Sequence, residues 1–171
     1  MKNQKGFSLI ELLIVVVIIG IIASIAIPNL LASRRSANEA SAISSMRTLV
    51  TAEATYSSSL GAGNYGNLQA LNGGGLIDGI LGGGASGTET GKSGYTFLIT
   101  VVNATATNHP QFDLNTKPQQ FGTGFSGTGS RSFMVNEAGI LYYQIADIPV
   151  STPWAGVTST NRVPTPGITL Q

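Results

Sequence analysis

The hydrophobic residues of this chain are most densely concentrated in its first 33 positions. Between Phe7 and Ser33 the only charged side chain is Glu11, and apolar residues occupy every side of the segment rather than one stripe. As a helix, the 27 positions from 7 to 33 would extend about 40 Å, which exceeds the roughly 30 Å hydrocarbon core of a bilayer. The pattern therefore predicts a helix that lies in lipid or against copies of itself.

The helical pattern continues beyond this apolar segment. Residues 29–59 contain no glycine or proline, and a small, mostly apolar stripe recurs at steps of three and four residues. The stripe consists of Ala40, Ile43, Arg47, Val50 and Ala54, with Met46 and Leu49 beside it, whereas Glu39, Ser45 and Glu53 fall largely elsewhere. We expect one helix from about Phe7 to Ser58, with Gly61 as its carboxy-terminal cap. Gly20 and Pro28 should let it bend or loosen, since proline removes a helical hydrogen bond.

A glycine-rich stretch follows, from Gly61 to Gly94. Its scattered Leu and Ile residues predict a long irregular connection that is held at a few points. Within it, "GTETGKS" at 87–93 imitates a phosphate-binding loop, but one residue is missing between the first glycine and Gly-Lys. No apolar strand leads into these residues and no helix-forming stretch follows them, so we expect no nucleotide site.

The remainder is typical of β-strands. Residues 95–103 form a β-branched and aromatic run, residues 111–115 suggest an edge strand, and residues 131–145 predict a hairpin whose turn contains Gly139. We expect three or four antiparallel strands, covered by the second half of the helix. The expected shared core is Ile43, Val50, Phe97, Phe133 and Leu141. The proline-rich tail from Ile148 onward is predicted to be a loop, with Trp154 packing it down.

Composition excludes several classes of function. The charged fraction is 10% and the net charge is +1, so no basic face for nucleic acid is indicated. The absence of cysteine excludes disulfides and thiolate sites, and His109 is the only histidine. Acidic residues are scattered singly, without a nucleophile, base and orienting group in one pattern. We therefore expect no catalytic residue, no metal site and no cofactor.

A conventional secretory signal is an open alternative for the amino terminus. Lys2 and Lys5 would form its basic region, and small residues at Ser24 and Ala26 would form its cleavage motif. The mature chain would then begin at Ile27 and be a secreted, non-enzymatic binding domain. Glu11 argues against this reading, because it lies inside what should be an uncharged region. The flanking Lys and Arg residues balance one another and leave the membrane orientation open.

The stretch "KGFSLIELLIVVVIIGIIASIAIPNLL" resembles the amino terminus of type IV pilins and pseudopilins. The shared features are a short basic leader ending in Gly6, an aromatic Phe7, a carboxylate at Glu11, an unbroken apolar run and Pro28 at its end. The resemblance implies that prepilin peptidase cleaves between Gly6 and Phe7 and that the new amine of Phe7 is methylated. It also implies that Glu11 meets the Phe7 amine of a neighbouring subunit and so sets the register of assembly.

The resemblance also implies a fold, a set of partners and a location. The fold is α+β: one long amino-terminal helix packed on an antiparallel sheet. The expected segments are a leader (1–6), a transmembrane or filament-core half (7–33), an amphipathic half (34–60), a glycine-rich loop (61–94), and a sheet with its tail (95–171).

The expected function is that of a structural subunit of a type IV pilus filament. Its partners would be copies of itself, prepilin peptidase, the inner-membrane assembly machinery and membrane lipid. The subunit would lie in the inner membrane with its carboxy-terminal part extracytoplasmic, and then in an extracellular filament. A pseudopilin of a secretion or competence system is the alternative. Many pilins close the carboxy-terminal loop with a disulfide, which this chain lacks, and Asp147 alone makes no calcium cluster of the kind many secretion pseudopilins have.

Overall fold

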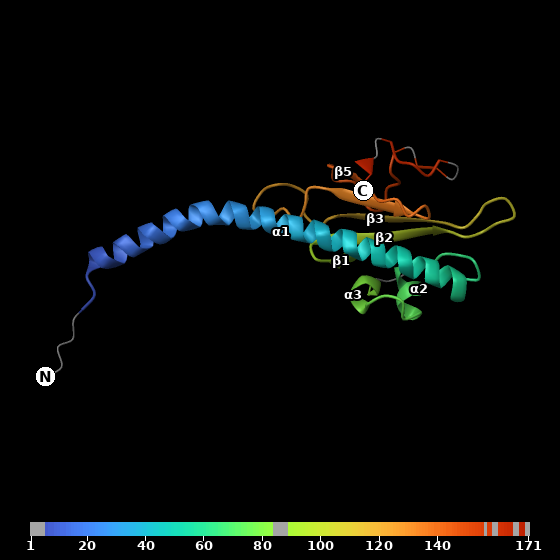
Figure 1. Ribbon diagram of the computed structural model, residues 1–171, viewed down its shortest axis with the longest axis horizontal. Helices are drawn as coiled ribbons and strands as arrows, with labels where there is room; N and C mark the ends of the chain where they lie inside the picture. Colours follow the sequence, from blue (N-terminus) through green and yellow to red (C-terminus); the bar gives the residue numbers. More distant parts are fainter. Residues whose placement is uncertain (1–5, 84–88, 156, 159–160, 166–167, 170–171) are drawn as a thin grey trace.

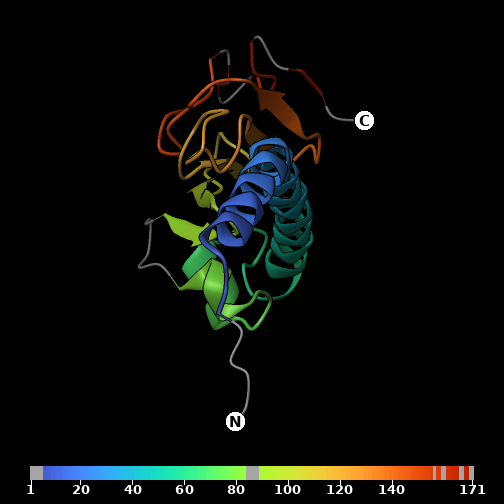
Figure 2. The same ribbon diagram turned by 90° about the vertical axis from the view of Figure 1, so that its left-hand side faces the viewer.

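The computed structural model describes residues 6–83, 89–155, 157–158, 161–165 and 168–169. One long helix, α1 (Leu9–Ser59), carries along its second half a head that is formed by the described residues that follow the helix (Figure 1). Viewed from the amino-terminal end, the first half of α1 projects past the head (Figure 2). The expected helix from about Phe7 to Ser58 is confirmed within one or two residues at each end. We call residues 9–33 the apolar half of α1 and residues 34–59 its amphipathic half.

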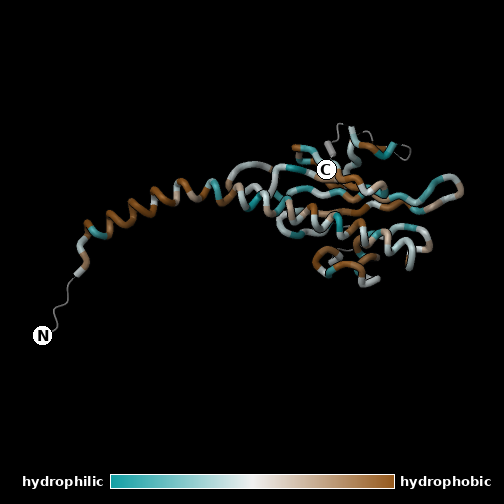
Figure 3. Tube along the Cα trace, in the orientation of Figure 1, coloured by the Kyte–Doolittle hydropathy of each residue, from teal (hydrophilic) through white to brown (hydrophobic). Residues whose placement is uncertain are grey.

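Hydropathy divides α1 at the point where the head begins. Hydrophobic residues follow one another almost without interruption along the apolar half, whereas the amphipathic half alternates between the two kinds (Figure 3). The helix ends where the Leu60 and Gly61 amides both donate to the Tyr56 carbonyl, at 2.9 and 2.7 Å. Leu60, rather than Gly61, is the carboxy-terminal cap, and the left-handed conformations that turn the chain occur at Ala62 and Gly63.

The buried face of the amphipathic half is rotated from the expected one. Its buried residues are Glu39, Ala42, Ser45, Met46, Leu49, Ala52 and Glu53, whereas Ala40, Arg47 and Ala54 are exposed. The expected stripe was therefore wrong for these three positions. The physical reason is that the two glutamates on the packing face bind groups of the head, which a local count of apolar residues cannot include.

The glycine-rich stretch contains more regular structure than expected. Two short helices, α2 (Leu68–Gly73) and α3 (Gly79–Gly82), are capped by the side chains of Asn67 and Asp78. Strand β1 (Thr90–Lys92) follows, and Lys92 Nζ lies 2.7 Å from Asp78 Oδ2. The prediction of an irregular connection was wrong here, because polar caps and buried Leu68, Leu71 and Leu81 organise the segment. Of the residues that imitate a phosphate-binding loop, 87 and 88 lie outside the described residues.

Within the described residues the sheet is antiparallel and has six strands, in sequence order. After β1 come β2 (Tyr95–Val102), β3 (Gln111–Pro118), β4 (Ser132–Asn136), β5 (Tyr142–Gln144) and β6 (Ile168–Thr169). The α+β class, the strand from Tyr95 and the hairpin with Gly139 in its turn, at φ 72°, are confirmed. The sheet exceeds the expected three or four strands, and its edges are the short strands β1 and β6.

Strand β3 is an inner strand, so its prediction as an edge was wrong. It pairs with β2 along eight residues and with β4 along four. Thr116 and Asn115 of β3 are buried and use their polar groups inside the fold. Thr116 Oγ1 donates to the Thr96 carbonyl at 2.7 Å, and Asn115 Nδ2 donates to the Val150 carbonyl at 3.2 Å.

Two hydrophobic clusters lie on opposite faces of the sheet. Successive residues of β4 alternate between them: Phe133 and Val135 join the larger cluster, under α1, and Met134 joins the smaller one. The larger cluster holds Phe97, Phe133 and Leu141, with Ile43 and Val50 packed against it, which confirms the expected core. In the smaller cluster, Trp154 packs on Met134 and Tyr142, so its predicted role in holding the tail is confirmed.

Candidate functional site

The predicted cleavage site lies in an extended segment ahead of α1. Ser8 has extended backbone angles and helical structure begins at Leu9. Phe7 is 88% exposed, and a side chain added at Gly6 would meet no atom within 4 Å. The fold of the chain therefore imposes no requirement for glycine at position 6, and any such requirement has to come from a second molecule.

Glu11 lies in the first turn of α1 and its side chain turns back toward the amino terminus. Its Oε2 accepts a hydrogen bond of 2.9 Å from the Ser8 amide. An acid in the first turn is stabilising, because the free amides at a helix start carry partial positive charge. The structure thus gives Glu11 a local role as a helix cap, and it aims the carboxylate at the segment that contains Phe7.

Most of the apolar half of α1 is not covered by the rest of the described chain. The large hydrophobic side chains from Phe7 to Ile22 are all at least half exposed, and no residue of the most apolar 18-residue window of α1 is buried. By length and composition α1 is able to cross a membrane. It is the only such helix among the described residues.

Gly20 and Pro28, the predicted weak points, both lie inside the continuous helix α1. The amino-terminal part of α1 curves away from the line of the amphipathic half (Figure 1). A side chain added at Gly20 would contact nothing within 4 Å. Their role in bending the helix stays a prediction.

Glu39 attaches the amphipathic half of α1 to the chain just before β4. Its Oε1 accepts hydrogen bonds from the Ser130 amide and hydroxyl, at 2.9 and 3.0 Å, and its Oε2 lies 2.9 Å from Arg131 Nε. The Arg131 guanidinium also lies over the Tyr143 ring, 5.4 Å from its centre. One carboxylate thereby fixes the helix against the start of β4 and, through Arg131, against β5.

Glu53 performs a similar attachment two helical turns before the end of α1. Its side chain is fully buried, and Oε2 accepts a hydrogen bond of 2.9 Å from the Gly66 amide. Oε1 finds no hydrogen-bond donor within the described part of the chain. Burial raises the pKa of Glu53 to about 7, against the lowering effect of the Gly66 amide.

The sequence does contain a signal for these attachments. Glu39 and Glu53 continue the spacing of the buried residues, at steps of three and four: Glu39, Ala42, Met46, Leu49, Glu53. Reading acidic residues as solvent-facing hid this stripe. An acid in register with a buried stripe indicates a buried carboxylate whose partner comes from another segment.

Arg162 fastens the carboxy-terminal tail to the sheet. Its Nε lies 2.7 Å from Glu137 Oε1, and its Nη2 lies 2.5 Å from Asp113 Oδ1 and 3.0 Å from the Phe112 carbonyl. The Arg162 carbonyl accepts a 2.6 Å hydrogen bond from Asn136 Nδ2. Burial raises the pKa of Asp113 despite this partner. At Glu137 burial acts in the same direction, but the hydrogen bonds from Arg162, the backbone hydrogen bonds and the charge of Arg162 together lower the pKa. Sequence reasoning missed this cluster.

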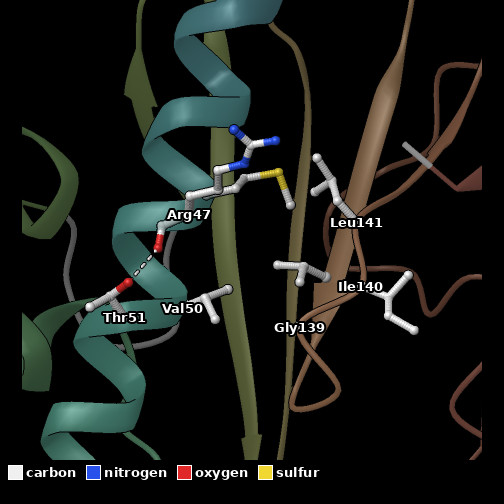
Figure 4. A pocket seen from close by; sticks show the side chains of 8 residues that line it. Arg47, Val50, Thr51, Gly139, Ile140 and Leu141 are labelled. Atoms are coloured by element: carbon white, nitrogen blue, oxygen red, sulfur yellow. Dashed lines mark hydrogen bonds between the residues drawn. The ribbon is translucent and has the colours of Figure 1, made fainter. Parts of the chain in front are cut away.

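The described part of the head contains a groove between α1 and the sheet. A hollow of about 480 Å³ lies between α1 and the turn that joins β4 to β5 (Figure 4). Arg47, Val50 and Thr51 line its helix side, and Gly139, Ile140 and Leu141 line the other. The Thr51 hydroxyl donates to the Arg47 carbonyl at 3.1 Å. Among the described residues, no three His, Cys, Asp or Glu side chains come together as a metal site would require.

The amino-terminal segment of the chain is similar to segments of known proteins. Residues 1–27 match the model of the prokaryotic N-terminal methylation motif. The type IV wide pilus major component PilA4 of Thermus thermophilus is 64% identical over 39 residues, which are 23% of this chain and 30% of that protein. No solved structure gives a significant match to the chain.

Two further relatives represent two kinds of assembly. The type II secretion system core protein G of Vibrio cholerae is 41% identical over 56 residues, 33% of this chain and 38% of that protein. The type IV major pilin protein PilA of Myxococcus xanthus is 44% identical over 54 residues, 32% of this chain and 24% of that protein. In each case the chain spans less than two fifths of the relative. The methylation motif and these relatives show that the amino-terminal segment is similar to that of type IV pilins and pseudopilins, and the long helix packed on an antiparallel sheet is consistent with the type IV pilin fold.

Proposed function

We propose that this chain is a structural pilin subunit which polymerises into an extracytoplasmic type IV pilus filament. The observation that carries the proposal is the apolar half of α1, which is long enough to cross a bilayer and has no cover from its own head. So large an apolar surface has to lie in lipid or against other subunits. Members of this family are in general structural and not enzymatic, and we assign the chain no catalytic role.

Processing would prepare the subunit for assembly. Prepilin peptidase removes residues 1–6 by cutting between Gly6 and Phe7, and the new amine of Phe7 is methylated. The subunit then waits in the inner membrane, with residues 7–33 in lipid and the head on the extracytoplasmic side. The inner-membrane assembly machinery moves it into the filament, where residues 34–60, the glycine-rich segment 61–94 and the remainder 95–171 form the outer layer.

Glu11 would set the register between subunits. Transfer from lipid to the filament core exchanges one apolar environment for another, so hydrophobicity gives little net drive. A carboxylate and an ammonium are each costly there alone, and a close pair offsets much of that cost. The side chain of Glu11 already turns toward the amino terminus. An incoming helix that is out of register would leave Glu11 and a Phe7 amine unpaired.

Gly20 and Pro28 would allow the helix to adapt to its neighbours. The open surface at Gly20 lets another helix approach closely, since no side chain projects there. Pro28 leaves one helical carbonyl without its usual donor, so the helix loosens there at low cost. Local unwinding at these two positions would give the filament extensibility.

A pseudopilin is the second candidate, and the similarity to core protein G of Vibrio cholerae favours it. The two candidates share the processing step and the helix-mediated assembly. They differ in the assembly that the subunit enters, which is a type IV pilus in one case and a secretion or competence system in the other. Imaging of cells that express the chain in a host lacking its own pilin separates them.

Substitutions at Glu11 test the proposed function. Glu11→Gln keeps an oxygen that accepts from the Ser8 amide but removes the charge, whereas Glu11→Ala removes both. Both variants should be cleaved and inserted in the membrane, and both should yield few or no filaments by electron microscopy in cells without the wild-type chain. The exposed Glu89→Gln is the matched control and should assemble normally. Abundant filaments from Glu11→Gln would reduce Glu11 to a helix cap and refute the register role.

A further inference from the structure

The loop between β3 and β4, residues 119–131, lies against α1 where its apolar half ends (Figure 1). Asn38 Nδ2 donates to the Thr128 carbonyl at 2.9 Å, and Arg35 Nη1 donates to the Gly124 carbonyl at 3.3 Å. The loop is also closed on itself, because the Gly122 amide donates to the Gly129 carbonyl and the Thr128 amide to the Gln120 carbonyl. Its position beside α1 is therefore fixed by contacts on both sides of its tip.

This fixed loop displays an aromatic side chain to the outside. Phe125 is 80% exposed, and it lines a small hollow together with Leu31, Arg34 and Asn38 of α1. Leu30, one residue earlier on the helix, is also 68% exposed. A single exposed hydrophobic residue is ordinary, but here Phe125 extends the apolar surface that already runs along residues 7–31.

The charged side chains beside this apolar surface are positive. No acidic residue occurs between Leu12 and Asn38, and none occurs in residues 119–130. Arg34 and Arg35 are the charged side chains at the end of the apolar run, and neither forms an ion pair within the part of the chain that the structure describes. Glu39, the next acid along α1, is occupied by Arg131 and Ser130.

The length of the apolar run places this surface at a membrane boundary. Residues 7–33 extend about 40 Å as a helix, close to the ~40–45 Å of a bilayer with its headgroup regions. When that run spans the bilayer, Arg34 and Arg35 lie at the headgroups, and the loop that contacts them lies there too. An aromatic ring beside two arginines matches that layer, which is apolar on one side and anionic on the other.

We propose that Phe125, Arg34 and Arg35 form a docking surface for an anionic phospholipid bilayer, which holds the head against the membrane before assembly. The inference rests on the membrane-anchored state that the proposed function includes. The apolar half of α1 would fix the subunit at one point, and Phe125 would fix the head at a second. Extraction of the subunit into a filament would then release Phe125 from lipid.

The test uses single cysteines, which the cysteine-free chain allows without further changes. Full-length protein is reconstituted in vesicles of phosphatidylcholine with phosphatidylglycerol, and in vesicles of phosphatidylcholine alone. A nitroxide label at Thr123→Cys, beside Phe125, is compared with one at Ala106→Cys, in the exposed loop between β2 and β3 at the far end of the head. A label at Ile18→Cys reports whether the helix has entered the bilayer. Accessibility to oxygen and to a water-soluble nickel chelate gives the depth of each label.

In anionic vesicles we expect the label at 123 to be shielded from the nickel chelate, and the label at 106 to remain in water. The ratio of docked to undocked heads should fall about fivefold with Arg34→Gln, and roughly tenfold or more with Phe125→Ser. Vesicles without phosphatidylglycerol should give less shielding. The label at 18 should be unaffected by either substitution.

Each of four results would overturn the proposal. Equal nickel accessibility at 123 and 106, with the label at 18 in lipid, would leave the anchor intact and refute the docking surface. Equal shielding at 123 with and without anionic lipid would refute the role of the arginines. Shielding at 123 that occurs only in isolated filaments would assign the surface to a second copy of the chain. A label at 18 that remains in water would instead refute the membrane anchor, and the docking surface with it.

Discussion

Glu53 is an acid buried at the contact between α1 and the loop that follows it. Its position is set by one hydrogen bond from the Gly66 amide, and its second oxygen has no donor in the described chain. Because burial disfavours the charged carboxylate, the pKa rises from 4.5 to about 7. The folded head therefore holds a proton on Glu53 at pH values where the unfolded chain has released it.

This pKa predicts how stability depends on pH. Between pH 4.5 and pH 7 the folded state binds more protons than the unfolded state, so the free energy of unfolding falls as the pH rises. The contribution of Glu53 to this fall is about 3 kcal/mol. Glu53→Gln should remove it, and above pH 7 the variant should be at least as stable as the wild type. Urea unfolding of the full chain in detergent measures this through the fluorescence of Trp154, the only tryptophan.

The exposed Glu89→Gln is the control for this prediction, because it makes the same chemical change on the surface. Its stability should follow the wild type at every pH. If Glu53→Gln shows the same fall between pH 4.5 and pH 7 as the wild type, the dependence arises from another group and the prediction is wrong.

Arg162 holds the carboxy-terminal tail through contacts that lysine cannot reproduce. Lysine keeps the charge but cannot reach Asp113, Glu137 and the Phe112 carbonyl at once, because it lacks the planar guanidinium. Arg162→Lys should leave part of this half-buried cluster unpaired, at a cost of about 1 to 3 kcal/mol. The Val157 and Val163 amides in the tail should then exchange with deuterium more than fivefold faster.

A surface ion pair provides the control for the Arg162→Lys prediction. Lys117 and Asp147 are 3.3 Å apart, and the aspartate side chain is half exposed. Lys117→Gln should change the free energy of unfolding by less than about 1 kcal/mol and leave tail exchange nearly unchanged. Equal effects from Arg162→Lys and Lys117→Gln would mean that Arg162 does not hold the tail.

At the scale of elements, α1 and the sheet are held together chiefly by the larger hydrophobic cluster. Phe133 is fully buried in it, whereas Phe125 protrudes from the head. Phe133→Ala should lower the free energy of unfolding by about 3 to 5 kcal/mol, and Phe125→Ala should lower it by less than about 0.5 kcal/mol. Urea unfolding in detergent compares the two variants. A small loss for Phe133→Ala would remove this residue from the shared core.

The elements that could be predicted are those with a strong local pattern. The long helix follows from a helix-forming run that extends from its apolar start to Ser59. Gly20 and Pro28 are the only glycine and proline in this run. The hairpin of β4 and β5 follows from two apolar runs around a glycine turn. Both patterns are contained in a few tens of neighbouring residues, so no knowledge of distant partners is needed.

The elements that could not be predicted depend on partners far along the chain. β3 is an inner strand whose polar side chains are satisfied by the Val150 and Thr96 carbonyls, and Arg162 of the tail binds its Asp113. The face of α1 that packs is set by the loops that bind Glu39 and Glu53. A glycine-rich composition concealed α2, α3 and β1 because a few leucines and two polar caps are enough to organise them.

At the scale of the whole molecule, the two halves of α1 lie in different environments. Its amphipathic half is part of a folded head with its own core, and the most apolar 18-residue window of its apolar half has no buried residue among those that the structure describes. The candidate site was accessible to sequence reasoning because it is linear: Gly6, Phe7 and Glu11 lie within six positions. The Glu39, Glu53 and Arg162 contacts were not, because each joins segments that are distant in sequence.

The central claim is that the mature subunit begins at Phe7 and assembles through the helix that follows. Mass spectrometry of the amino terminus of this chain, purified from filaments, tests it most directly. We expect a methylated Phe7 as the first residue, with residues 1–6 absent. A subunit that begins at Met1, or one that begins at Ile27 after conventional signal cleavage, would contradict it.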